Sequence, residues 1–210
     1  MNIYKKLLKK NLKNNNKKGF TLVELLVVIG LLGAIAVIVI AAINPVEQAN
    51  RARDTRYMTS ALELSKAIDR YFVGRSNYPW FDEIGTFNTA TFGYTLVDSD
   101  GVGLCKADCT TVNHGVLITG SELKPEFVSR DFVGASIASG DAMQVGKEAG
   151  VAGAVHVCYT PLSDSAQEKA TNDDNVWTLG VNAARTAVAD PETDCGVDWG
   201  SAGCFTCVPE

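Results

Sequence analysis

The chain begins with polar and basic residues and then becomes abruptly apolar. From Phe20 to Ile43 it contains a single charged residue, Glu24. A helix needs about 20 apolar residues to cross the hydrocarbon core of a bilayer, whereas the apolar region of an ordinary secretory signal has only about 7–15. The pattern therefore predicts a membrane-spanning helix.

Beyond this stretch the pattern becomes that of an amphipathic helix. Pro45 lacks a backbone donor and clashes with the preceding turn, so we expect a kink there. Over 46–73, apolar side chains recur at spacings of three and four, which predicts one buried helix face. We expect Gly74 to cap the helix. The predicted face consists of Tyr57, Ala61, Leu64, Ile68, Tyr71 and Phe72.

Three arginines lie near the start of this second helix, at Arg51, Arg53 and Arg56. We expect them to be solvated or to face lipid phosphates. A salt bridge to an acidic neighbouring subunit is the alternative.

The segment 74–210 predicts a β-rich globular domain, because short strand-like runs are bounded there by Gly, Asp, Asn or Ser. The segment is long enough for one sheet-based core. We therefore expect an α+β fold, in which a small, mainly antiparallel sheet packs on the apolar face of the long N-terminal helix. The expected strands are 92–97, 115–119, 151–159 and 176–181.

Charge is divided unevenly along the chain. Residues 1–19 contain seven lysines and no acid, and the remainder contains 12 Lys and Arg against 24 Asp and Glu. A basic head stays on the cytoplasmic side of a membrane, so the sequence predicts a single-pass protein of the cytoplasmic membrane with its N-terminus inside. The acidic body argues against nucleic acid as a partner.

Glu24 is the anomaly in the apolar stretch. An ionised carboxylate in hydrocarbon costs at least a few kcal/mol, so it calls for a partner. No Lys or Arg follows within one helical turn. One candidate is an amine freed at Phe20 of a neighbouring copy, if the chain is cut there. The alternative is that Glu24 lies near the headgroups and is solvated.

The run from Lys17 to Gly30, KKGFTLVELLVVIG, resembles the class III signal of type IV pilins and type II secretion pseudopilins. The resemblance extends to about Pro45, and a Tyr-Pro pair at residues 78–79 extends it weakly. It implies that a membrane peptidase cuts after Gly19 and methylates the new amine of Phe20. It also implies that Glu24 neutralises the Phe20 amine of an adjacent subunit during assembly.

The resemblance implies a pilin-like α+β fold in four parts. These are a cleaved leader (1–19), a transmembrane or filament-core helix (20–45), an amphipathic helix (46–73) and a disulfide-linked, β-rich globular domain (74–210).

The expected function is that of a structural subunit that polymerises through its N-terminal helix. The resemblance implies three partners: identical subunits, a prepilin peptidase and an inner-membrane assembly platform. It places the assembled protein in an extracellular pilus or in a periplasmic or cell-wall filament. One alternative is a pseudopilin of a type II secretion or DNA-uptake machine. Another is a membrane-anchored domain that never polymerises, which Glu24 disfavours because an anchor needs no buried acid.

Six cysteines all lie in the predicted external part, and an even number in an exported domain favours up to three disulfides. The sequence leaves their pairing open. The rival interpretation is a zinc site formed by Cys105, Cys109, Cys204 and Cys207. The other two cysteines are Cys158 and Cys195.

The sequence offers little for catalysis, and we expect no enzyme and no resident cofactor. It contains no nucleophile elbow, P-loop or dinucleotide fingerprint. His114 and His156 are the only histidines, and His156 lies in an apolar run typical of a core or rim position. The acidic runs 98–101 and 173–175 are typical of turns. A calcium site there is the minor alternative.

Overall fold

The computed structural model describes residues 19–42, 44–106, 109, 113–134, 140–150, 153–180, 184–196 and 198–210. The chain divides into two compact units, unit 1 (Met1–Pro45) and unit 2 (Val46–Glu210). Each unit is described by itself.

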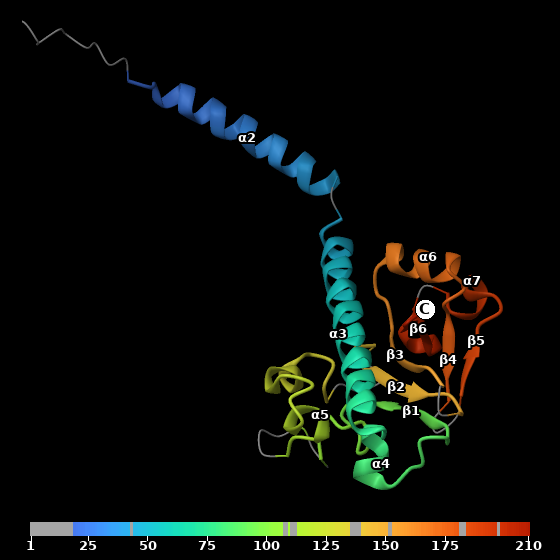
Figure 1. Cartoon of the computed structure of the whole chain (residues 1–210). Coiled ribbons are helices and arrows are strands. Elements are labelled where there is room, and N and C mark those ends of the chain that lie inside the picture. The colour runs from blue at the N-terminus through green and yellow to red at the C-terminus, as the bar shows by residue number, and fades with distance from the viewer. Residues whose placement is uncertain are drawn as a thin grey trace, which may run out of the picture. The chain divides into compact units, whose positions relative to one another are not determined.

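Unit 1 contains the helix α2 (Leu22–Ala42) (Figure 1). Its stretch Leu22–Ile40 is long and apolar enough to cross a membrane. The next helix, α3 (Pro45–Arg75), has proline as its first residue. The fixed φ and missing N–H of proline suit that position.

α3 buries the face that its sequence predicts. Tyr57, Ala61, Leu64, Ile68 and Tyr71 are all buried in the main core of unit 2. This face of α3 is therefore the surface on which unit 2 is built.

The predicted cap at Gly74 is wrong. α3 continues through Arg75, and Ser76 adopts the left-handed conformation with φ 60°. The N–H of Ser76 donates to the carbonyl of Phe72 at 2.7 Å, which satisfies one of the last helical acceptors. The left-handed residue that ends the helix therefore lies two positions after Gly74 and is not a glycine.

A six-stranded antiparallel sheet with the order β1-β2-β3-β6-β4-β5 confirms the α+β prediction. In its centre Val157 lies opposite Val145 on one neighbouring strand and Val208 on the other. All three valines belong to the same core cluster as the α3 face, so this side of the sheet packs on α3. The strands are β1 (Phe92–Leu96), β2 (Met143–Lys147), β3 (Val155–Tyr159), β4 (Trp177–Leu179), β5 (Arg185–Ala187) and β6 (Cys204–Val208).

The expected strand at 115–119 is wrong, because this segment forms the short helix α5 (Val116–Thr119). Tertiary contacts override its β-branched composition. The N–H of Val116 donates to the Glu83 carboxylate at 2.9 Å, and that of Leu117 to the Gly103 carbonyl at 2.8 Å. These bonds satisfy donors of the first helical turn.

Two other expected strands, in 151–159 and 176–181, are shorter than predicted, and β2, β5 and β6 were missed. β2 contains Gly146 and Lys147, which weaken a strand pattern. Lys147 is nevertheless only 1% exposed, and its amine donates to the carbonyls of Glu148 and Gly150. A buried lysine with backbone acceptors of this kind has no signature in the local sequence.

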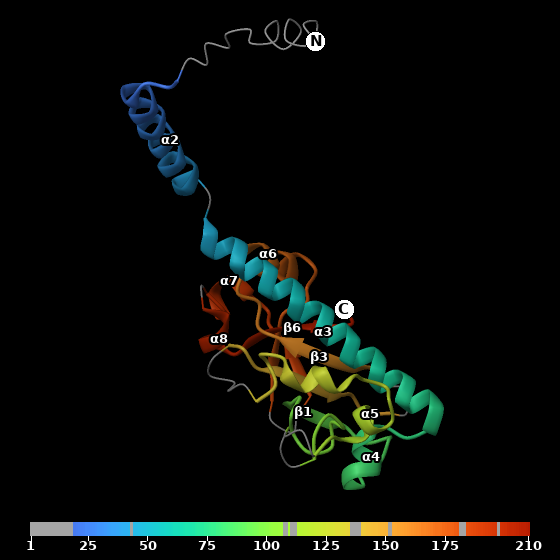
Figure 2. The same cartoon turned by 90° about the vertical axis from the view of Figure 1, so that its left-hand side faces the viewer.

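Short helices complete unit 2. Figures 1 and 2 place α4 beside the C-terminal turns of α3, and Figure 1 shows α3 between the strands and the α5 segment. The Tyr-Pro pair at residues 78–79 starts α4, with Pro79 in the first position. The helices are α4 (Pro79–Ile84), η1 (Pro125–Ser129), α6 (Asp164–Asn172), α7 (Pro191–Asp194) and α8 (Trp199–Ala202).

The cysteines form disulfides, which confirms that interpretation over a four-thiolate zinc site. Cys158 and Cys207 lie opposite each other on β3 and β6, so their bond joins the last strand to the centre of the sheet. A second bond joins Cys195 to Cys204 at the start of β6, and the third closes the loop between Cys105 and Cys109. Two of the three bonds therefore anchor the C-terminal strand.

His156 lies on the sheet face opposite α3, as a core histidine. It is 4% exposed, and its Nδ1 atom has no hydrogen-bond partner in the part of the chain that the structure describes. Burial, reinforced by the nearby Arg185 charge, lowers the pKa of His156 from 6.5 to about 4. The folded domain therefore holds this imidazole neutral.

We predict that unit 2 loses stability in mild acid because of His156. Between pH 6.5 and 4, His156 is protonated in the unfolded chain but remains neutral in the folded chain. The free energy of unfolding therefore falls as the pH falls through this window. From pH 7 to 5 the loss should be about 2 kcal/mol. Urea unfolding of the detergent-solubilised chain, followed by tryptophan fluorescence, measures it. The variant His156→Asn should lack this component, and an equal pH dependence in both proteins would refute the prediction.

Candidate assembly site

α2 presents apolar side chains around its whole circumference. Every α2 residue whose burial is described is exposed within the chain. Leu, Ile and Val side chains make up most of this surface. A helix that is apolar all round requires a membrane or other helices to cover it. α2 is therefore the surface most in need of a partner.

Glu24 belongs to the first turn of α2. The N–H of Glu24 donates to the Thr21 hydroxyl at 3.1 Å, so Thr21 caps the helix. Thr21-Leu-Val-Glu24 also has the spacing of a capping box, a signal that the sequence reasoning missed. Among the described residues, none forms a hydrogen bond or ion pair with the Glu24 carboxylate. This carboxylate is thus positioned at the positive end of the helix dipole and is open to a cation.

Gly19 and Phe20 precede the helix and are both exposed. Neither is helical, so the peptide bond between them stands outside the hydrogen-bonded turns of α2. The lysines of the expected leader, including Lys17 and Lys18, lie outside the described residues. The structure therefore places the expected cleavage position and Glu24 within one short segment at the start of α2.

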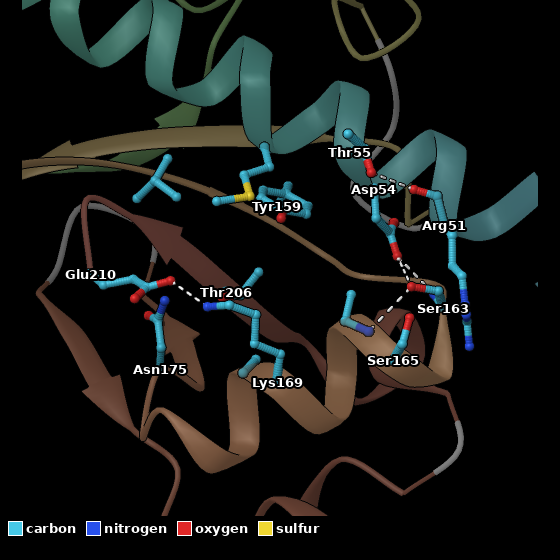
Figure 3. A pocket seen from close by; sticks show the side chains of 14 residues that line it. Arg51, Asp54, Thr55, Tyr159, Ser163, Ser165, Lys169, Asn175, Thr206 and Glu210 are labelled. Carbon is cyan, nitrogen blue, oxygen red and sulfur yellow. Dashed lines mark hydrogen bonds and ion pairs between the residues drawn. The ribbon is translucent and has the colours of Figure 1, made fainter.

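In unit 2, the first turns of α3 are held by a buried network that we call the polar clasp. It consists of Arg53 and Asp54 with Gly140, Asp141 and the segment 160–163. The Asp54 carboxylate accepts hydrogen bonds from the N–H of Ser163 at 2.8 Å and from the Ser163 hydroxyl at 2.7 Å (Figure 3). It also accepts from the N–H of Leu162 at 3.1 Å. Asp54 is therefore a buried anion with a nearly complete set of donors.

Arg53 supplies the opposite charge of the clasp. Its guanidinium donates to the carbonyls of Gly140 at 2.7 Å and Thr160 at 3.1 Å. It also bonds the carboxylates of Asp54 and Asp141, each at 3.0 Å. The Tyr57 ring lies 4.0 Å below the guanidinium carbon. The clasp thus continues directly into the aromatic core.

The structure corrects the expectation for the three arginines near the start of α3. Arg53 is buried inside its own domain, and is neither solvated nor directed to lipid. Arg51 is half-exposed and bonds Glu47 at 2.8 Å, which lowers the pKa of the Glu47 carboxyl. Arg56 is exposed and lies 3.6 Å from Asp131. Only Arg51 and Arg56 are available to another molecule.

A cavity of about 310 Å³ opens beside the clasp, between α3, α6 and β6 (Figure 3). The buried residues Tyr159 and Thr206 line it, and burial raises the pKa of the Tyr159 phenol to about 12. The Lys169 amine bonds the Glu210 carboxylate at 2.8 Å. These two charges are therefore paired with each other.

The described residues contain no group of three or more His, Cys, Asp or Glu side chains that could hold a metal ion. In the run 173–175, Asp173 pairs with Lys169, and the buried Asn175 amide donates to the Cys207 carbonyl at 2.8 Å. In the run 98–101, the N–H of Ser99 donates to the Leu96 carbonyl at 3.0 Å. These contacts are those of turn residues that serve the fold.

Comparison with known proteins identifies a known motif in the N-terminal segment. Residues 14–40 match the family model of the prokaryotic N-terminal methylation motif. This motif is the class III signal peptide of type IV pilins, and it covers Gly19, Phe20 and Glu24. No curated protein and no solved structure matches the chain. The apolar helix followed by an antiparallel α+β unit is consistent with a pilin-like fold.

We predict that Asp54→Ala destabilises unit 2 by about 3–5 kcal/mol, because it removes one of the two carboxylate partners of the buried Arg53 guanidinium and leaves the N–H groups of Leu162 and Ser163 without their acceptor. Urea unfolding of the detergent-solubilised chain measures the change. Asp131→Ala is the matched control, since it removes an exposed ion pair and should cost about 0–1 kcal/mol. Equal stability of the two variants would contradict the role of the clasp.

Proposed function

We propose that this prepilin, which carries the N-terminal methylation motif of type IV pilins, is a structural subunit of a type IV pilus or pilus-like filament. The observation that carries the proposal is α2, an exposed helix that is apolar all round and has one acid in its first turn. Polymerisation would cover this surface with copies of itself.

Assembly would exchange the lipid contacts of α2 for contacts with the α2 helices of other subunits. Lipid tails are as apolar as the helix, so burial alone does not drive α2 out of the bilayer. Packing between helices and the pairing of polar groups must supply the preference. The pairing of Glu24 with the amine of Phe20 from a neighbouring subunit supplies an attraction that lipid lacks. It would also set the register between subunits.

Before assembly, the chain would cross the cytoplasmic membrane once, with its basic leader inside. A prepilin peptidase would cut after Gly19 and methylate Phe20. An inner-membrane platform would then add the subunit to a filament outside the membrane. This role uses no catalytic residue of the chain and no cofactor.

We predict that assembled protein consists of residues 20–210 and begins with an N-methylated Phe20. The reason is that Gly19-Phe20 lies at the junction of the basic leader and the apolar run. Intact-mass measurement of surface material, followed by N-terminal sequencing, tests this. Detection of Met1, or of a cut beyond Ile43, would defeat the prediction.

We predict that Glu24→Ala abolishes or greatly reduces filaments while it spares membrane insertion and the folding of unit 2. A Phe20 amine in the filament core would lose its counterion, at a cost of about 3–5 kcal/mol at each joint. Membrane insertion of α2 should cost less free energy, because the substitution removes the charge of Glu24 from the apolar segment. The measurement is the number of filaments per cell at equal membrane levels of cleaved protein.

Two further variants serve as controls for this test. Val23→Ala should reduce filament numbers far less than Glu24→Ala, because it removes two methyl groups from the helix packing but leaves the Glu24 carboxylate in place. Glu24→Gln retains hydrogen bonding without charge and should rescue assembly only in part. Normal filament numbers with Glu24→Ala would refute the pairing mechanism and favour a plain membrane anchor. Short filaments confined to the periplasm would instead indicate a pseudopilin.

A further inference from the structure

The cysteines of unit 2 are not paired in the order in which they occur along the chain. The first pairs with the second, the third with the sixth and the fourth with the fifth. The bond between Cys158 and Cys207 therefore encloses the bond between Cys195 and Cys204. If each thiol were joined to the next one to appear, Cys158 would instead be bonded to Cys195.

The topology of the sheet delays the contact that aligns Cys158 with Cys207. β6 is the last strand in the sequence, yet it lies between β3 and β4 in the sheet (Figure 1). Its register with β3 places Cys207 directly opposite Cys158. Among the described strands, β4 pairs only with β5 and β6. The fold therefore selects the native partner of Cys158 only after the last residues of the chain have joined the sheet.

Export sets the order in which the thiols of unit 2 meet. With the N-terminus inside, unit 2 reaches the oxidising side of the membrane from its N-terminal end onward. Cys105 and Cys109, only four positions apart, appear first and find each other. Cys158 appears next, and the first thiol to follow it is that of Cys195. The native partner, Cys207, is the last of the six to appear.

We infer that Cys158 is first oxidised to a bond with Cys195, and that a thiol–disulfide isomerase outside the membrane then rearranges this bond to the native one with Cys207. The inference rests on the proposed function for the orientation of the chain. It adds a partner of defined chemistry, because uncatalysed disulfide rearrangement takes minutes to hours.

The oxidation steps consume one disulfide of an oxidant for each bond formed. The Cys158 thiolate attacks the disulfide of an oxidoreductase and forms a mixed disulfide with it. The Cys195 thiolate resolves this mixed disulfide, which leaves a Cys158–Cys195 bond and an oxidant with two thiols. Cys204 and Cys207, with only two residues between them, are then oxidised to each other in the same way.

The rearrangement consists of three thiolate attacks and involves no net oxidation. The isomerase thiolate attacks the Sγ atom of Cys158 and releases the Cys195 thiolate. That thiolate attacks the Sγ atom of Cys204, which forms one native bond and releases the Cys207 thiolate. The Cys207 thiolate then attacks the Sγ atom of Cys158, forms the other native bond and releases the isomerase thiolate. Two disulfides are broken and two are formed.

Burial limits the time in which this rearrangement is possible. In the folded unit, Cys158 and Cys207 have no exposed surface, and Cys204 is 1% exposed. A thiolate of another protein therefore has no access to these sulfur atoms once β6 lies in the sheet. The isomerase must act before β6 is inserted, and the native bonds are protected from it afterwards.

Pulse labelling of the full chain tests the inference. The chain is expressed in two Gram-negative strains that share a periplasmic disulfide oxidant, one with and one without a periplasmic thiol–disulfide isomerase. Thiols are blocked with N-ethylmaleimide after short and long intervals. The unfolded chain is digested with chymotrypsin, which separates the last three cysteines by cleavage after Trp199 and Phe205, and the linked peptides are mapped by mass spectrometry.

Both strains should show the Cys158–Cys195 bond at short intervals. With isomerase, it should give way to the Cys158–Cys207 bond. Without isomerase, most chains should keep the Cys158–Cys195 bond and lose the native one. Equal yields of the native bond in the two strains would overturn the inference, and so would the absence of the Cys158–Cys195 bond at short intervals.

Two double variants provide matched controls, because each lacks one disulfide. Cys195→Ser with Cys204→Ser removes the enclosed bond, so the remaining cysteines pair in chain order and Cys158–Cys207 should form equally in both strains. Cys105→Ser with Cys109→Ser retains the enclosed bond, so the dependence on isomerase should persist. An equal dependence on isomerase in the two double variants would also overturn the inference.

A second measurement tests the balance of the rearrangement. Chain from the strain without isomerase is purified in detergent and incubated with a catalytic amount of reduced isomerase and no oxidant. The native bonds should appear while the chain gains no free thiols. Conversion that requires full reduction and reoxidation of the chain would contradict the three-step exchange.

The outcomes separate the inference from the proposed function. A chain that acquires the native bonds through the isomerase but never polymerises in its own cells would overturn the proposed function alone. A chain recovered with six free thiols would overturn the proposed membrane orientation, and the inference with it.

Discussion

Unit 2 is organised by the burial of one face of α3. Tyr57, Leu64 and Tyr71 form a continuous apolar strip, and the valines of the central strands pack on it. The α5 and η1 segment attaches to α3 through ion pairs, such as Arg70 with Glu122 at 3.1 Å. If this strip were not apolar over its whole length, neither the sheet nor the loops would have a common surface on which to assemble.

The apolar strip begins at Tyr57, after the first turns of α3. Polar contacts hold those first turns to the rest of unit 2. Before Tyr57, the helix is held by the buried charges of Arg53 and Asp54. Such a network depends on geometry, because each charge must keep its partners or incur a desolvation cost.

The sequence predicted those parts that depend on local pattern. The apolar helix α2 followed from a long run with a single charge, the α3 face from its helical period, and the N-terminal motif from the order of its residues. The parts that failed depend on distant partners. Arg53 bonds residues 87 and 107 positions away, and the 115–119 segment became helical because Glu83 and Gly103 accept its first donors. Neither outcome could be read from neighbouring residues.

The central claim is that α2 leaves the bilayer and forms the core of a polymer. Electron cryo-microscopy of filaments purified from the cell surface, with mass spectrometry of their subunit, tests it most directly. The account predicts a helical filament of this chain, with α2 of every subunit in the core and each Glu24 carboxylate beside the Phe20 amine of a neighbour. A filament in which α2 lies outside the core, or the recovery of this chain solely as a monomer in the membrane fraction, would contradict it.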